Sequence, residues 1–258
     1  MRLPKTSAPN FLYLDPARKY VNLNQFTPGT VEIYSVLNRA NETAMINTGS
    51  GAPGWSPTGL QATYAWRNNP GAVIPGTPGQ PALTFATSEF LEYDALASQF
   101  SGTEKPMTMT CVMSCSAFAS GTANTVWAAA ATGAATPILT LKYTSSNLHV
   151  TETSSGGTTD AYASIDGGVH VATVVRSAAS LTLRVDGVQV ATTAIGTPAA
   201  QTYNTFTIGS LNSNGTNGSF FNGSIGTMAL YGGVADIDEV EAYLLLRAGV
   251  QRGSVFNG

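Results

Sequence analysis

Residues 170–195 constrain the fold more than any other part of the chain, because they predict consecutive β-hairpins. Apolar and polar side chains alternate over residues 181–185, which is typical of a strand with one buried face. The following Asp186-Gly187 favours the positive backbone φ angles of a two-residue hairpin turn. Residues 169–176 are apolar at almost every position, which indicates an inner strand covered on both faces.

The composition agrees with a single β-sandwich. The chain has 258 residues, a length at which all-β sandwiches commonly form one domain. Charged residues make up only 10%, against roughly 25% in an average soluble domain, so Thr, Ser, Asn and Gly must supply much of the polar surface. The net charge of −3 gives no electrostatic basis for binding nucleic acid. No segment approaches the ~20 consecutive apolar residues that cross a bilayer, and we expect no membrane partner.

Short apolar runs separated by turn residues recur along the rest of the chain. We therefore predict an all-β fold, a two-sheet antiparallel β-sandwich of the jelly-roll type, with one short C-terminal helix. Residues 48–81 are rich in Gly and Pro, which favours long ordered loops, an insertion or a subunit contact over a second domain. Residues 209–223 are rich in Asn and Gly and are predicted to form a loop. The other expected strands span residues 31–37, 61–66, 107–116, 126–131, 139–143 and 148–153.

The amphipathic helix is predicted near residues 236–247. Asp236 is expected as its N-cap, with Glu239 three residues later in a capping-box arrangement, and Gly249 is expected at its end. The side chains expected to dock this helix on the edge of the sandwich are Tyr243, Leu244 and Leu246.

The acidic string at residues 236–241 is the best candidate for catalysis. Retaining glycoside hydrolases place two carboxylates ~5 Å apart, and a strand here would put Asp236 and Asp238 on one face. The helical run that follows favours a different role, in which the carboxylates interact with the dipole of a helix N-terminus. His149 and His170 both fall within predicted strands, and the sequence has neither a serine-nucleophile elbow nor a phosphate-binding loop. We therefore predict a protein that is not an enzyme.

Cys111 and Cys115 lie on one face of the strand predicted at residues 107–116. Residues four apart on a strand are separated by ~13 Å, which is too far for a disulfide or a shared metal ion. We therefore expect two buried free thiols, no metal site, and no disulfide-stapled extracellular protein.

Six short sequence motifs are spread along the chain. They are Leu12-Tyr13-Leu14-Asp15, residues 83–91, His170-Val171-Ala172-Thr173-Val174, Leu181-Thr182-Leu183-Arg184-Val185-Asp186-Gly187, Phe206-Thr207-Ile208-Gly209 and Phe221-Asn222-Gly223-Ser224-Ile225-Gly226. Together they resemble concanavalin A-like lectin/glucanase (laminin-G-type) sandwich domains, and the first motif resembles the opening of such domains in phage virion proteins. The resemblance implies a concanavalin A-like β-sandwich that binds carbohydrate or protein, and it does not imply catalysis.

Two functions fit these observations. The first is a non-enzymatic structural component of a phage virion, such as a capsid decoration, head-fibre or tail-associated protein. It predicts a location in the virion, capsid or tail subunits as partners, and a homo-oligomer or several copies. The alternative is a carbohydrate-binding module or receptor-binding protein that recognises host surface glycans, and one protein can combine both roles. Five aromatic residues could stack on sugar rings: Trp55, Trp66, Trp127, Tyr203 and Tyr231. Core or loop positions are favoured for most of them.

The predicted organisation is an extended arm at residues 1–10, one sandwich domain at residues 11–250 and a tail at residues 251–258. Two prolines in the arm favour an extended segment that gains order against a partner. No cofactor is predicted. The resemblance to the family makes Ca²⁺ binding possible, but acidic residues of the family's motifs are missing near Phe85 and Gly226, so the sequence does not support it. The candidate ligand or partner contacts are Arg2, Lys5, Asn212, Asn214, Asn217 and Asn222.

Overall fold

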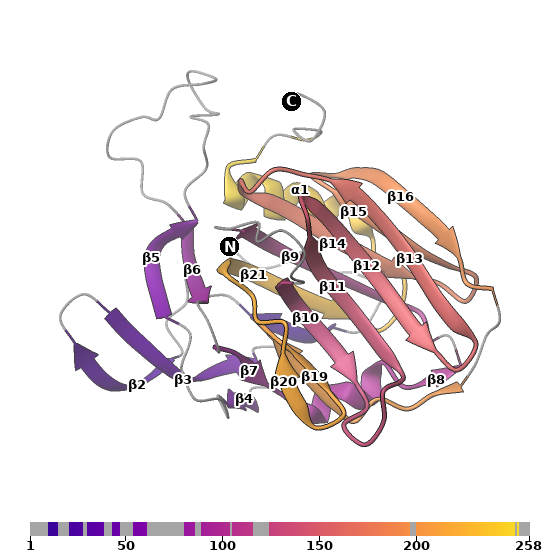
Figure 1. Ribbon diagram of the computed structural model, residues 1–258. Coiled ribbons are helices and arrows are strands. Elements are labelled where there is room, and N and C mark those ends of the chain that lie inside the picture. Colours follow the sequence, from indigo (N-terminus) through magenta and orange to yellow (C-terminus); the bar gives the residue numbers. More distant parts are fainter. Residues whose placement is uncertain are drawn as a thin grey trace.

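The computed structural model describes six strands between residues 10 and 85, and residues 89–103, 105–115, 124–196, 200–250 and 252. β-Strands dominate the described residues and form two antiparallel layers, and the α-helix α1 (Ile237–Ala248) lies on one side (Figure 1). The predicted all-β sandwich with a short C-terminal helix is therefore confirmed. Within the described residues, no helix has the length and apolar character needed to span a bilayer.

The first sheet is built on the hairpins predicted at residues 170–195. Its strands, in order across the sheet, are β16 (Val188–Ala194), β15 (Ser180–Val185), β14 (His170–Arg176), β9 (Met107–Cys115) and β21 (Gly223–Tyr231). The far edge of β21 pairs with β6 (Gln80–Phe85) and β1 (Asn10–Leu14), and β5 (Gly54–Leu60) pairs with β6. Asp186 and Gly187 have φ angles of 50° and 77° in the turn between β15 and β16, as their sequence predicts.

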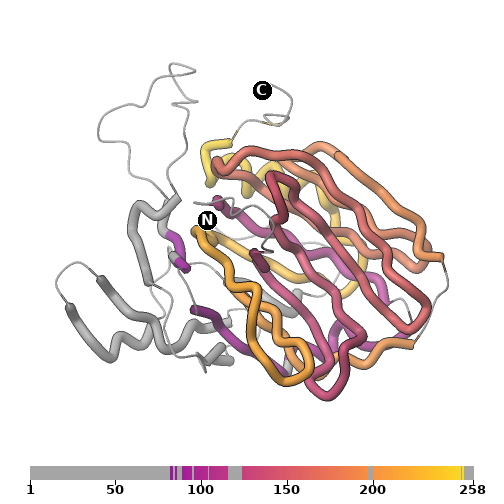
Figure 2. The backbone as a smooth tube through the Cα atoms, in the orientation of Figure 1, coloured from indigo at the N-terminus to yellow at the C-terminus, as the bar shows by residue number. Residues whose placement is uncertain are grey.

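The second sheet packs face to face with the first. In order, its strands are β13 (Gly157–Ser164), β12 (Asn147–Ser154), β11 (Ile138–Thr144), β10 (Asn124–Ala130), β18 (Thr205–Ile208), β7 (Leu91–Glu92), β4 (Thr43–Ile46), β3 (Thr30–Asn38) and β2 (Val21–Thr27). A 3-10 helix, η1 (Asp94–Gln99), and the short pair β8 (Gly102–Thr103) and β17 (Ala200–Gln201) close one end. The backbone trace in Figure 2 shows the β12–β13 hairpin beside β16, where the two sheets meet.

The core fills the space between the two inner faces. Every second side chain of the long strands points into it, as the period of a β-strand requires. Phe100, Trp127 and Phe206 stack within it, with the ring centroids of Phe100 and Phe206 5.3 Å apart. Large apolar side chains buried in this way each contribute about 1.5–3 kcal/mol to stability.

Helix α1 covers the outer face of the first sheet, which explains why all seven residues of β14 are buried. Tyr243 and Leu244 pack against this face as predicted, but the helix lies on central strands and not on an edge. Leu246 is 49% exposed, and Leu245 is buried in its place. Asp236 is the N-cap residue, although its side chain makes no capping hydrogen bond, so the predicted capping box does not form.

The Asn-rich segment at residues 209–223 differs from the predicted loop. It contains a small hairpin, β19 (Leu211–Ser213) and β20 (Thr216–Gly218). Asn214 and Gly215, with φ angles of 53° and 78°, form the tight turn between them. The strand predicted at residues 61–66 lies outside the described residues, as do the predicted tail beyond Arg252 and the arm before Asn10, which stay predictions.

Two glycines of the sequence motifs are required by close packing. Gly209 has a φ of 87°, and a Cβ atom there would overlap the ring of Phe85. A Cβ atom on Gly223 would overlap the carbonyl oxygen of Ser114 on the neighbouring β9. These positions of the family-like motifs therefore allow a close approach, of Gly209 to the Phe85 ring and of β21 to β9 at Gly223.

Candidate functional site

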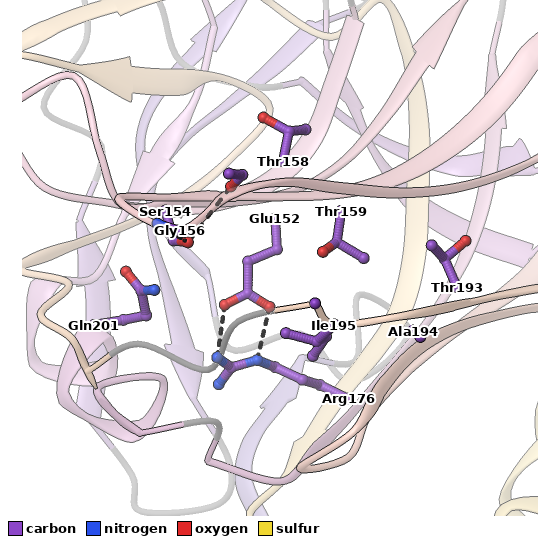
Figure 3. Close-up of a pocket in the computed structure, with 12 residues that line it drawn as sticks. Glu152, Ser154, Gly156, Thr158, Thr159, Arg176, Thr193, Ala194, Ile195 and Gln201 are labelled. Carbon is purple, nitrogen blue, oxygen red and sulfur yellow. Dashed lines mark hydrogen bonds and ion pairs between the residues drawn. The ribbon is translucent and has the colours of Figure 1, made fainter.

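A polar pocket of about 220 Å³ opens at one end of the sandwich, where the β12–β13 hairpin meets the ends of β14, β16 and β17 (Figure 3). The residues that line the pocket are Glu152, Ser154, Gly156, Gly157, Thr158, Thr159, Arg176, Thr193, Ala194, Ile195, Gly196 and Gln201.

An ion pair between the two sheets forms the floor of this pocket. Arg176 of β14 donates through Nε to Oε2 of Glu152 at 2.8 Å and through Nη2 to Oε1 at 2.6 Å. Arg176 and Glu152 are only 1% and 5% exposed. Further hydrogen bonds run from Arg176 Nη1 to the carbonyl oxygen of Lys105 at 3.1 Å and from the Tyr203 hydroxyl to Glu152 Oε1 at 3.3 Å. The bidentate geometry offsets the large cost of burying two charges.

Tyr203 acts as a fixed hydrogen-bond donor in this network. Burial, followed by the negative charge of Glu152, raises the pKa of its hydroxyl far above the ordinary value. The phenol therefore stays protonated at any physiological pH and keeps donating to the carboxylate.

Hydroxyl groups and backbone form the walls of the pocket. Thr193 donates to the carbonyl oxygen of Asp160 at 2.8 Å, and Ser154 donates to that of Gly157 at 3.4 Å. Two polar side chains are not used in this way. The Gln201 amide, on a residue only 6% exposed, and the half-buried Thr159 hydroxyl make no hydrogen bond within the described part of the chain. Both are drawn flanking Glu152 in Figure 3.

The predicted contact residues lie elsewhere. Arg2 and Lys5 lie outside the described residues. Asn212, Asn214 and Asn217 come together on the β19–β20 hairpin, with Asn212 opposite Asn217. Asn217 Oδ1 accepts a hydrogen bond from Ser210 Oγ at 3.1 Å, Asn212 is only 7% exposed, and Asn214 is exposed at the turn. Asn222 is half-buried beside β21, and none of the four asparagines lines the pocket.

Glu152 and Arg176 were not among the predicted site residues, although the strand period carries a signal for them. The inward positions of β12 are Leu148, Val150 and Glu152, and those of β14 end at Arg176 after two apolar residues. A charged residue at the next inward position after a series of apolar ones is expected to be buried, and a buried charge must be paired. Glu152 and Arg176 therefore each require a partner of opposite charge, but the strand period does not say which residue that partner is.

Aromatic side chains mostly take core positions, as expected. Trp127, Tyr203 and Tyr231 are buried, and the side chains of Trp55 and Trp66 lie outside the described residues. One aromatic was missed: Tyr162 on β13 is 58% exposed and stacks on His149, with ring centroids 5.0 Å apart. It alternates outward with Thr158 and Asp160, so the strand period could have revealed it.

The acidic string at the start of α1 holds the helix on the sheet. Arg184 of β15 donates through Nη2 to Glu241 Oε2 at 2.7 Å and to Asp238 Oδ1 at 3.3 Å. Hydrogen bonds from the guanidinium to Glu241, together with the negative charge of that residue, raise the pKa of Arg184 despite its partial burial. Glu241 is only 1% exposed. The helical interpretation of the acidic string is confirmed, and the carboxylates of Asp238 and Glu241 bind Arg184.

His170 occupies a second buried polar cluster behind the turn at Asp186. Its Nδ1 lies 2.8 Å from Asp186 Oδ2, and its Nε2 lies 3.0 Å from Asp166 Oδ1. Burial alone would lower the pKa of His170, but the hydrogen bonds and charges of the two aspartates outweigh it and raise the pKa. Asp186 Oδ1 also accepts the Val171 backbone N–H at 2.9 Å, so this cluster fixes the hairpin geometry.

Both cysteines are buried free thiols, as predicted. Burial raises the pKa of the Cys111 thiol to about 12. Among the described residues, no group of three or more His, Cys, Asp or Glu side chains is arranged to hold a metal ion.

Together, the two-layer sandwich and its end pocket define a lectin-like β-sandwich protein. The sequence profile of the concanavalin A-like lectin/glucanases superfamily matches residues 99–241, more than half of the chain. The chain belongs to this superfamily. No curated protein sequence matches it.

Solved structures of a botulinum neurotoxin binding domain share the fold at low sequence identity. The binding domain of botulinum neurotoxin DC in complex with rat synaptotagmin II has a TM-score of 0.57 at 9% identity, over 93% of this chain and 52% of that chain. The same domain in complex with SialylT gives 0.55 at 9% identity, over 92% and 51%. A Ruminococcus gnavus IT-sialidase CBM40 bound to α2,3-sialyllactose gives 0.49 at 16% identity, over 63% and 94%. The chain spans about half the length of the botulinum neurotoxin structures, and at these identities the likeness concerns the fold.

Proposed function

We propose that the protein is a non-enzymatic glycan-binding module. The observation that carries this proposal is the polar end pocket, which the Gln201 amide and the Thr159 hydroxyl line without a hydrogen-bond partner in the described structure. Both groups can therefore bond a ligand in the pocket, and a ligand rich in hydroxyl groups matches their donors and acceptors. The proposal agrees with membership of a lectin/glucanase superfamily and with the SialylT complex of the neurotoxin binding domain.

Binding without hydrolysis is supported by the state of the carboxylates. Glu152 is held bidentately by Arg176 and also accepts a hydrogen bond from Tyr203. A general acid must reach its substrate to exchange a proton, and both carboxylate oxygens of Glu152 are already engaged by Arg176. The carboxylates of Asp238 and Glu241 belong to the helix–sheet contact described above. The module as proposed needs neither a cofactor nor Ca²⁺.

A glycan array probed with the full chain tests this proposal. Thr159→Phe places a large side chain in the pocket, and it should abolish the glycan signal while the array glycans remain intact by mass spectrometry. Thr216→Phe, at an exposed position of β20, is the matched control and should bind as the wild type does. A wild-type protein that binds no glycan, or equal binding by both variants, would refute the pocket as a glycan site. Cleaved glycans would show that the protein is an enzyme.

We further propose that this module is carried in several copies on a phage virion, where it contacts capsid or tail subunits. The resemblance of Leu12-Tyr13-Leu14-Asp15 to virion-protein openings supports this role, and these residues fall in or directly after β1, which pairs with β21. A protein that begins at Phe11 keeps almost all of β1, so it should fold with a nearly unchanged Tm and yet fail to incorporate into particles. Salt should weaken any contact made by Arg2 and Lys5. Normal incorporation of the truncated protein would refute an attachment role for the arm.

A further inference from the structure

We infer that the end pocket takes a single neutral, hydroxyl-rich sugar unit at the end of a glycan and discriminates against carboxylated sugars such as sialic acids. The inference rests on the glycan binding proposed above and adds the chemical class of the ligand. Three features of the pocket carry it: its charge, its unused hydrogen-bonding groups and its size.

The charge of the pocket is already balanced. Arg176 is the sole cation among the described lining residues, and it gives Nε and Nη2 to Glu152 and Nη1 to the Lys105 carbonyl oxygen. Its Nε–Nη2 edge is therefore occupied by Glu152, whose negative charge also neutralises the guanidinium. A second carboxylate would lie near Glu152 and be repelled by it, with no free cation among those residues to offset the repulsion. A neutral ligand meets no such penalty.

The unused groups suit hydroxyls, which both donate and accept. The Gln201 amide offers two N–H donors and one carbonyl acceptor, and the Thr159 hydroxyl offers a donor and an acceptor. Both side chains flank the carboxylate of Glu152 in Figure 3. Oε2 of Glu152 accepts only the bond from Arg176 Nε among the described contacts, so a lone pair remains for a sugar hydroxyl. Ile195 adds an apolar patch in the lining for the C–H face of a sugar ring.

The size of the pocket limits the ligand to one sugar unit. Its volume of about 220 Å³ is below the roughly 300–1,000 Å³ of sites that enclose drug-sized ligands. The described lining contains no aromatic side chain, so stacking contributes nothing and hydrogen bonds must supply the selectivity. A ligand that leaves a polar group of the pocket without a hydrogen-bond partner should bind more weakly, and this difference is the source of the selectivity.

The test measures binding of the full chain to methyl hexosides and to N-acetylneuraminic acid by ligand-observed NMR, and to neutral and sialylated glycans on an array. Gln201→Met keeps the size of the side chain and removes its polar groups. We expect it to weaken binding of the neutral sugars about 3- to 10-fold, the effect of about one lost hydrogen bond. Gln189→Met, at an exposed position of β16, is the matched control and should leave binding unchanged.

The outcomes separate this inference from the proposed function. Binding of neutral sugars that weakens in Gln201→Met and not in Gln189→Met supports the inference. Stronger binding of N-acetylneuraminic acid than of every neutral sugar overturns the inference while glycan binding stands. Neutral-sugar binding that is equal in both variants overturns it as well, because the sugar then sits elsewhere. Binding to no sugar by either method overturns both proposals.

Discussion

The variant Glu152→Gln should reveal how strongly the buried ion pair ties the two sheets together. The substitution keeps the shape of the side chain but removes the charge that neutralises Arg176, which is only 1% exposed. Removing one partner of such a buried pair costs about 3–5 kcal/mol, because the other charge is left uncompensated. For a domain of this size each kcal/mol shifts Tm by about 2–4 °C, so we expect Tm to fall by about 10 °C.

Urea denaturation followed by tryptophan fluorescence measures this loss, since Trp127 is fully buried in the core. Glu239→Gln, at an exposed glutamate in the first turn of α1, is the matched control and should change stability by less than about 0.5 kcal/mol. The double variant Glu152→Leu with Arg176→Met should recover most of the loss, because apolar residues replace both charges at once. A stability of Glu152→Gln within about 1 kcal/mol of the wild type would refute the argument that the pair is buried and closed.

Three further predictions concern pH, thiol reactivity and packing. The pKa of His170 is raised in the folded state, so protonation of this residue stabilises the fold. The stabilisation is complete below pH ~6.5, the ordinary pKa of His, and is lost as pH rises through the folded pKa. The free energy of unfolding, measured between pH 6 and 9, should fall with pH in the wild type and not in His170→Gln. A thiol reagent should find Cys111 and Cys115 unreactive in the folded protein and count two thiols in urea, and rapid labelling without denaturant would contradict their burial. Gly223→Ala should destabilise the protein by more than about 1 kcal/mol by calorimetry, since its Cβ would overlap the Ser114 carbonyl, whereas Gly133→Ala, which meets no atom, should not.

Local sequence patterns determined the elements of this fold. Alternation over β15, the Asp186-Gly187 turn and the continuous apolar run of β14 depend only on neighbours along the chain, so they could be read before any tertiary contact was known. The motifs that resemble the superfamily then predicted a two-sheet sandwich, and the match of the superfamily's sequence profile to residues 99–241 confirms that prediction. Burial of both cysteines followed from the same period of two.

The pocket was decided by the tertiary structure alone. Glu152 and Arg176 are 24 residues apart on different sheets, and Gln201 reaches them from β17. No local pattern specifies which inward positions of two sheets face each other, because that depends on how the sheets stack and where each strand ends. The same reason explains the choice of Leu245 over Leu246 on α1, since the face of the helix that is buried is set by the sheet beneath it. The sequence by itself determined which residues point inward, and only the packing of the two sheets decided which of them meet.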